Sequence, residues 1–265
     1  MKIGVSIGYK KLDAFEKSFG EYNVQHIQIG GIPGNIEGIR KELSEKIKAL
    51  KSQNPNIEIS LHAYNKLNLA EEVDEVRMLW IELAKKNIYL ARDIGAKFVN
   101  FHAGYGVDAG RRVQHEKCIN NLIPVFKELV EVGSECNVEI HIENVYPEQR
   151  NSDFCKLGDR VSDFKKIFDI KSEFLKLCYD YGHGNLDEQG IDILRSFNNR
   201  LGSIHAHDND QLADIHWPIG QEVGTIDWEN EIQYLKNIKF DGVFILESYI
   251  DDQVKSLEFL HRKGF

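Results

Sequence analysis

The stretch IEISLHAYNKLNLAEEVDEVRMLWIELAKKNIYLARDIGAKFVNFHAG, residues 57–104, decides the fold. It opens on a short apolar run, passes through a long segment with helical spacing, and ends on a second apolar run. Gly95 follows the helical segment, where a glycine C-cap is common. A strand, a helix and a second strand in this order predict a right-handed βαβ unit, and therefore a parallel sheet.

The same alternation continues in both directions along the chain and gives eight candidate strands. They are KIGVSIG (2–8), VQHIQIGG (24–31), IEISLHAY (57–64), KFVNFHAG (97–104), VEIHIENV (138–145), LKLCYDYGH (175–183), LGSIHAHD (201–208) and GVFILESY (242–249). Further helices are expected over 159–170, with Asp159 as N-cap, and over 228–238 and 252–264. Eight units in this length predict an α/β fold, a single (β/α)₈ TIM barrel spanning residues 1–265.

A doubly wound open sheet is the main alternative architecture. Such sheets usually have fewer strands and often carry a glycine-rich phosphate-binding turn after the first one. The corresponding residues here, GVSIGYKK, do not form the G-x-G-x-x-G pattern. The closed barrel is therefore the preferred prediction.

The composition disfavours several classes of function. A net charge of −9 disfavours broad nonspecific binding to nucleic acid or to an anionic membrane. No apolar stretch approaches the roughly 20 residues that cross a bilayer, and the first residues do not resemble a signal peptide. The four cysteines form no CxxC pair, so we expect a reduced, cytoplasmic protein with no membrane association.

Polar residues gather where the predicted strands end, which is where barrels place their active sites. Six consecutive strands end in a histidine or carboxylate, and the loop after the seventh adds a D-x-H pair. The residues are His62, His102, Glu143, Asp180 with His183 three positions later, His205, Glu247, and the loop pair Asp214 and His216.

Each of these residues alone has an ordinary explanation, such as a hydrogen-bonded structural histidine or a carboxylate that caps a helix. Together at one barrel mouth they would repel or desolvate one another unless a cation compensates. Imidazole and carboxylate ligands suit zinc, manganese, iron or cobalt. The pattern therefore predicts a site for divalent metal.

Five other histidines receive different predictions. His141 has the same strand parity as Glu143 and should point inward, deeper in the barrel. His207 shares the parity of His205 and is expected beside the metal or facing substrate. The remaining three, His26, His115 and His261, are expected on the surface.

With these residues identified, the chain resembles the xylose isomerase-like TIM-barrel superfamily over nearly its whole length. That group contains sugar and sugar-phosphate isomerases and epimerases, and apurinic endonucleases of the endonuclease IV type. The resemblance rests on LHAYNKLNLA (61–70), FHAG (101–104), IEN (142–144), YDYGHGN (179–185), HAHDND (205–210), DIHWPIGQEVGTIDW (214–228) and LES (246–248).

The resemblance implies roles for particular residues. The metal site common to the family matches Glu143, Asp180, His205 and Glu247, and the acid/base pair of the isomerases and epimerases matches Glu143 and Glu247. Endonuclease IV holds three zinc ions with additional ligands, which match His62, His102, His183, Asp214 and His216. All nine positions carry ligand-type residues here, so the resemblance implies a site of one to three ions.

Three segments depart from the endonuclease IV pattern. VYPEQRNS (145–152) replaces the TAGQG that usually follows its glutamate, and IGGIPGNIEG (29–38) lacks its Asn-Pro-Arg-aromatic stretch. Tyr64, Asn65 and Lys66 stand where that enzyme fills the gap at an abasic site. The YDYGHGN and PIGQEVGTIDW forms look more like the sugar branch.

The leading hypothesis is a metal-dependent sugar or sugar-phosphate isomerase or epimerase that uses zinc, manganese or cobalt. The partner would be a small-molecule sugar, with His207, Tyr64 and Trp217 as substrate-binding candidates and a homodimer as a possible assembly. A zinc phosphodiesterase acting on abasic-site DNA is the second hypothesis, and a non-catalytic metal- or sugar-binding barrel the third. Only the second needs a basic crescent around the mouth, for which the candidates are Lys10, Lys11, Arg111, Arg112, Arg150 and Arg160.

Overall fold

The computed structural model describes residues 1–107, 111–148 and 152–264, with the side chains of 111–114 left aside. Its strands form a closed barrel in the order β1-β10-β9-β8-β6-β4-β3-β2, and every neighbouring pair whose register is given is parallel. They are β1 (Lys2–Gly8), β2 (His26–Gly30), β3 (Glu58–His62), β4 (Phe98–His102), β6 (Glu139–Glu143), β8 (Leu175–Asp180), β9 (Leu201–Ala206) and β10 (Val243–Leu246). All eight predicted strands are confirmed, and closure excludes the open sheet.

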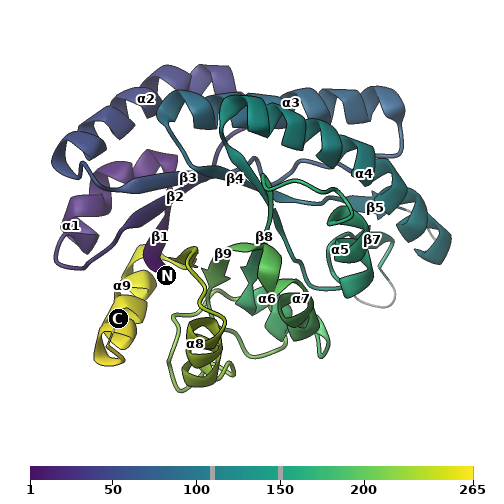
Figure 1. The fold of residues 1–265 in the computed structure, drawn as a ribbon. Coiled ribbons are helices and arrows are strands. Elements are labelled where there is room, and N and C mark those ends of the chain that lie inside the picture. The colour runs from purple at the N-terminus through teal and green to yellow at the C-terminus, as the bar shows by residue number, and fades with distance from the viewer. Residues whose placement is uncertain (108–110, 149–151, 265) are drawn as a thin grey trace.

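Helices surround this barrel, as Figure 1 shows. The α-helices are α1 (Phe15–Phe19), α2 (Ile36–Gln53), α3 (Asp74–Ile94), α4 (Arg111–Cys136), α5 (Val161–Ile167), α6 (Tyr181–Asn185), α7 (Gly190–Phe197), α8 (Trp228–Asn237) and α9 (Ile250–Arg262). Two 3₁₀ turns, η1 (Tyr9–Ala14) and η2 (Asn198–Arg200), complete them. Within the described residues, no helix combines the length and apolar character needed to cross a membrane.

The apolar core lies mainly between the strands and the helices. A large cluster fills this shell, whereas Phe98, Val243 and Ile245 form a separate, small one. These three alternate with shell residues along their strands, so they point to the opposite side of the sheet, into the barrel. Much of the barrel interior is consequently filled by buried polar side chains, which is unusual for this fold.

Two histidines predicted at the surface are buried instead. His26 lies inside the barrel, fully buried, with its Nε2 2.8 Å from the Ser60 hydroxyl and its ring stacked on Phe98. His115 on α4 is 8% exposed and places Nε2 2.8 Å from Asp163 of α5. Both predictions were wrong because a barrel interior and a helix–helix contact can each supply a polar partner. His261, by contrast, is exposed on α9.

His141 lies where its strand parity predicted. It is buried inside the barrel, stacked on Phe98 with 3.9 Å between ring centroids, and its Nδ1 is 2.8 Å from Ser203. Phe98 therefore stacks with two imidazoles, those of His26 and His141, inside the barrel.

Asp159 does not cap the helix that follows it. The N-cap residue of α5 is Arg160, with no side-chain capping bond, and the Asp159 carboxylate binds the Arg160 guanidinium at 2.7 and 2.8 Å. The Asp163 carboxylate accepts the Gly158 amide proton at 2.9 Å. The prediction failed because Arg160 offers Asp159 two charge-assisted hydrogen bonds, which are stronger than a single capping bond.

A second sheet was not predicted. Strands β5 (Tyr105–Val107) and β7 (Phe154–Lys156) pair antiparallel just beyond the ends of β4 and β6. Because they follow strands that end at the mouth, this ribbon extends the barrel on one side of the site (Figure 1). Each strand has only three residues, which gives almost no alternating pattern to read from the sequence.

The helix of residues 70–95 begins later than its sequence pattern suggested, at Asp74, and ends as predicted at Gly95. Gly95 has φ 69° and ψ 37°, in the left-handed region, and its amide bonds the Ala91 and Arg92 carbonyls. Only glycine adopts this conformation without a steric cost from Cβ.

We therefore expect Gly95→Ala to lower the free energy of unfolding by about 1 kcal/mol. Gly95→Asn should lower it less, because asparagine tolerates the left-handed region better than alanine. Urea denaturation of both variants checks the order. Equal stability of the alanine variant and the wild-type protein would contradict the assigned cap.

Candidate metal centre

The strand ends bring the predicted ligands to one mouth. Because the strands are parallel, their carboxyl ends lie together, and the register sets His102 beside Glu143 and Asp180 beside His205. His62 and His102 are the last residues of β3 and β4, and Glu247 directly follows β10. Six of the eight strands thus contribute a histidine or carboxylate at the same level.

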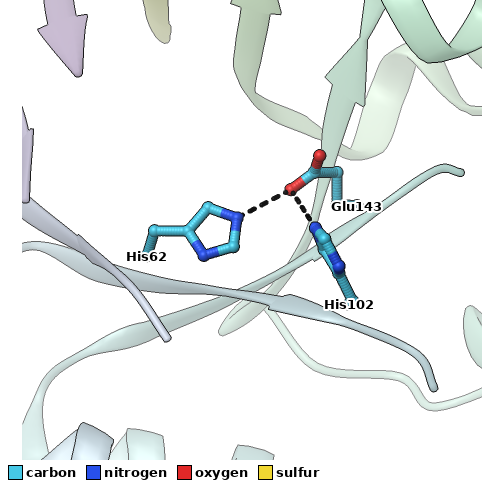
Figure 2. A group of neighbouring side chains, drawn as sticks. All are labelled: His62, His102 and Glu143. Atoms are coloured by element: carbon cyan, nitrogen blue, oxygen red, sulfur yellow. Dashed lines mark ion pairs between the residues drawn. The ribbon is translucent and has the colours of Figure 1, made fainter. Parts of the chain in front are cut away.

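Glu143 lies at the centre of the cluster. Its Oε2 is 3.4 Å from Nε2 of His62 and 3.3 Å from Nε2 of His102, as Figure 2 shows. Its Oε1 is 3.3 Å from Nδ1 of His183 and 3.4 Å from Nδ1 of His205. A single fully buried carboxylate therefore faces four imidazoles.

Ligand-type atoms within 4.8 Å of one another form several overlapping groups, and three of these groups together contain eight of the nine predicted ligands. These three groups are His62, His102 and Glu143; Glu143, Asp180, His205 and Glu247; and His207, Asp214 and His216. Glu143 belongs to the first two groups. His183 lies between the second and third, with Nδ1 3.7 Å from Asp180 and Nε2 3.3 Å from Asp214.

Backbone carbonyls orient three of the histidines. Nδ1 of His62 lies 3.0 Å from the Ala63 carbonyl, Nδ1 of His183 2.9 Å from that of Asn144, and Nδ1 of His216 2.7 Å from that of Glu247. A carbonyl only accepts, so each Nδ1 must carry the proton. The Nε2 lone pair of each ring then faces the cluster, in the arrangement typical of metal-binding histidines.

The electrostatics show why the cluster needs compensation. Burial alone would raise the pKa of Glu143, but His205 and His102 hold it well below its usual range. Burial opposes protonation of His205 and His183, yet neighbouring groups, including Glu143, raise the pKa of both imidazoles well above the usual value. The carboxylates stay ionised, and without a cation the imidazoles would have to take up protons to balance them.

Several buried atoms of the cluster lack hydrogen-bond partners. These atoms are both ring nitrogens of His205, Nδ1 of His207 and Oδ1 of Asp214. His205 Nδ1 is only 2.8 Å from Glu247, but without hydrogen-bond geometry. Leaving such groups unpaired is costly, and a divalent cation would satisfy them. The donor set of imidazoles and carboxylates therefore fits a metal centre.

Cys178 is also close to Glu143 and His205, but its chemistry differs. Burial raises the pKa of the Cys178 thiol to about 11. In the metal-free protein at neutral pH this side chain is therefore a thiol next to the cluster.

The open side of the cluster is a cavity of about 390 Å³. It is lined by Ser6, Gly8, Gly30, Gly31, Ile32, His62, Ala63, Asn65, His102, Glu143, His183, Asp214, His216, Glu247 and Ser248. Ligands of all three groups thus reach a single space of small-molecule size.

The three substrate-binding candidates lie around this cavity rather than in its lining. His207 is fully buried, stacks on His216 with centroids 3.7 Å apart and places Nε2 3.1 Å from Asp180. Tyr64 packs partly against the barrel core, and the Trp217 backbone pairs with Asp208. The contact of these three residues with substrate stays a prediction. His207 lies where a further metal ligand would lie.

Sequence reasoning missed two asparagines that hold the cluster. Asn100 donates a side-chain hydrogen bond to Oε2 of Glu143. The Asn144 side chain donates to the Asp180 carbonyl at 3.0 Å and accepts from the Asp180 amide at 2.7 Å, which ties β6 to β8. Asn100 could have been identified from the sequence, because it is a polar residue in the apolar run KFVNFHAG at a position whose side chain points into the barrel.

The YDYGHGN motif has a glycine at position 182, the second residue of α6, for a steric reason. A Cβ atom at this position would lie 1.9 Å from Cε1 of His207. Only glycine lets α6 approach the ring that closely, so the motif brings His183 and His207 together.

The basic residues considered for a DNA-binding crescent do not line the cavity, as far as the structure describes them. Lys10 and Lys11 are exposed beyond β1, and Arg160 is paired with Asp159. Arg150 and the side chains of Arg111 and Arg112 lie outside the described residues.

Comparison with known proteins agrees with this geometry. The model of the family described as xylose isomerase-like TIM barrel matches residues 21–263. The chain belongs to that family. The family resemblance expected from the motifs is therefore confirmed.

Individual relatives include an uncharacterized protein, an epimerase-like protein and a probable endonuclease. Uncharacterized protein MJ1311 of Methanocaldococcus jannaschii is 31% identical over 77% of this chain and 69% of its own length. A solved structure titled D-tagatose 3-epimerase-like protein has a TM-score of 0.83 and 28% identity, covering 99% of this chain and 96% of that one. The probable endonuclease 4 of Thermotoga petrophila is 27% identical over 60% of this chain and 54% of its own length.

The shared carboxylate leads to a prediction about metal stoichiometry. Protein loaded with zinc should hold up to three ions per chain, one for each group. We expect His62→Ala to lose one ion, and Glu143→Gln to lose two because Glu143 belongs to two groups. Elemental analysis after desalting measures the difference. His261→Ala, on the exposed face of α9, is the control, and equal losses from the two site variants would refute the shared position.

Proposed function

We propose that this protein is a divalent-metal-dependent sugar isomerase or epimerase. The observation that carries the proposal is the group of Glu143, Asp180, His205 and Glu247, whose ligand atoms converge beside a cavity of about 390 Å³. A metal ion held by these four residues would polarise the carbonyl of an open-chain sugar. Zinc, manganese and cobalt suit this ligand set.

Two carboxylates of the group would transfer the proton between carbons. Glu143 and Glu247 both line the cavity, and both lie beside His205, at 3.4 and 2.8 Å. The neighbouring His205 also keeps the pKa of Glu247 low, at about 2, against the effect of burial. Both groups are therefore ionised before substrate arrives and can act as bases. A carboxylate has two oxygens, so one can remain among the ligands while the other accepts the proton.

The structural relative supports the same reaction class. At 28% identity over nearly the full length of both chains, the similarity to the D-tagatose 3-epimerase-like protein exceeds a likeness of fold alone. The name of that protein points to proton transfer on a ketose.

A zinc phosphodiesterase is the second candidate. Two observations favour it: eight of the nine predicted ligands, with His207, form three neighbouring groups, and a probable endonuclease 4 is among the relatives. Clustered ions suit phosphodiester cleavage, where they activate water and stabilise the attacking and leaving oxygens. The described lining of the cavity, however, contains no lysine or arginine to meet a DNA backbone.

Proton transfer is tested directly in deuterated water. We expect protein loaded with zinc, manganese or cobalt to exchange the hydrogen on the carbon beside the carbonyl of a ketose, which NMR detects. Glu247→Gln should slow this exchange about a hundredfold or more, because it removes one of the two bases. Glu258→Gln, an exposed glutamate on α9, should leave it unchanged.

Incision of a duplex carrying one abasic site is the companion assay. We expect no incision by the same metal-loaded preparations. Incision without hydrogen exchange on any ketose would replace the isomerase proposal with the phosphodiesterase.

A further inference from the structure

Two barrel strands end differently from the other six. β1 ends at Gly8 and β2 at Gly30, followed by Gly31, and all three glycines line the mouth cavity. A Cβ at Gly8 would meet nothing within 4 Å, and one at Gly30 would meet only Ser6 Oγ at 3.8 Å. Where the other strands carry ligands, this glycine sector (Gly8, Gly30 and Gly31) leaves open space.

A buried polar side chain lies below the glycine sector. Gln28 is fully buried and precedes Gly30 by two residues, on the same face of β2. Neither its amide nitrogen nor its amide oxygen has a hydrogen-bond partner in the structure. It pairs in register with Ser6, which lines the cavity. An unpaired buried amide is costly, and this one leaves a donor and an acceptor unused beneath the lining of the sector, next to Ser6.

The described lining of the cavity offers an anion no lysine or arginine side chain. Its neutral polar groups are Ser6, Asn65 and Ser248. Barrels often bind phosphate at the loops after strands seven and eight, with the help of a helix N-terminus. Here the helix after the eighth strand, α9, begins with Asp251 and Asp252, which would repel a phosphate.

We propose that the glycine sector, with Ser6 and Gln28 beneath it, seats the non-reacting end of the substrate, and that this substrate is an unphosphorylated monosaccharide. The inference rests on the isomerase or epimerase function proposed above and specifies its substrate. A volume of about 390 Å³ is near the lower end for small-molecule sites, which suits one sugar ring or open chain rather than an oligosaccharide.

The substrate class is tested with paired probes. Metal-loaded protein is incubated with D-fructose, D-tagatose and D-ribulose and, separately, with their terminal phosphate esters, and hydrogen exchange is followed by NMR. We expect kcat/KM for the free ketoses to exceed that for the esters at least tenfold. A preference for the esters overturns the inference and leaves the proposed function intact. No exchange with either set overturns the proposed function, and this inference with it.

The seat is tested with a matched pair of glycine substitutions. Gly30→Ala adds a methyl group to the cavity without a clash, and we expect KM for six-carbon ketoses to rise about ten- to hundredfold. A four-carbon ketose, too short to reach the sector, should be affected less. Gly34→Ala adds the same methyl group outside the cavity, 3.6 Å from the Tyr64 ring, and should leave KM unchanged. Equal effects of the two substitutions would overturn the assignment.

Gln28→Met separates binding from folding. It conserves volume and removes the unpaired amide, so the variant should unfold at the same temperature as the wild-type protein or higher. We expect its metal content to be unchanged and its KM for the six-carbon ketoses to rise. An unchanged KM would show that Gln28 does not contact the substrate.

Discussion

The contact of one buried carboxylate, Glu143, with four imidazoles is the constraint on which the rest of the site depends. Two rings face each of its oxygens, all within 3.4 Å, and they come from β3, β4, β9 and the helix after β8. Such crowding is tolerable only where charges balance. A closed parallel barrel meets the geometric half of this demand, because it brings successive strand ends to one ring. A cation would meet the electrostatic half.

Holding a polar centre inside the barrel changes where the fold is stabilised. The large apolar cluster lies between the strands and the helices, whereas the separate inner cluster contains Phe98, Val243 and Ile245. Below the ligands lie other buried polar residues, among them Asn100, which bonds Glu143, and His141, which bonds Ser203. The outer shell supplies most of the hydrophobic stabilisation, and the interior orients ligands.

Both the barrel and its ligand set could be predicted from the sequence, because both follow from the local pattern of apolar runs. Apolar runs of known parity locate strand ends, and a residue such as Glu143 or His205 at such an end must face the mouth. Other features did not follow from such a local pattern. His26 was misplaced because Ser60 and Phe98, which accommodate it, belong to other strands. Asp159 was misplaced because its neighbour Arg160 competes for it. The ribbon of β5 and β7 is too short to show a period.

The ligand-bearing side of the mouth does not by itself choose between a sugar and a phosphodiester, because metal ions held there could serve either chemistry. The opposite side is more selective. A phosphodiester arrives with negative charge that must be met at every step of binding. The glycine sector presents backbone, with the neutral amide of Gln28 beneath it, and Asp251 and Asp252 lie in the first turn of the helix beyond Glu247. Specificity is a difference between two affinities. A cavity wall without a lysine or arginine side chain lowers the affinity for an anion, and thereby favours a neutral ligand. The bare strand ends therefore favour a neutral hydroxylated substrate.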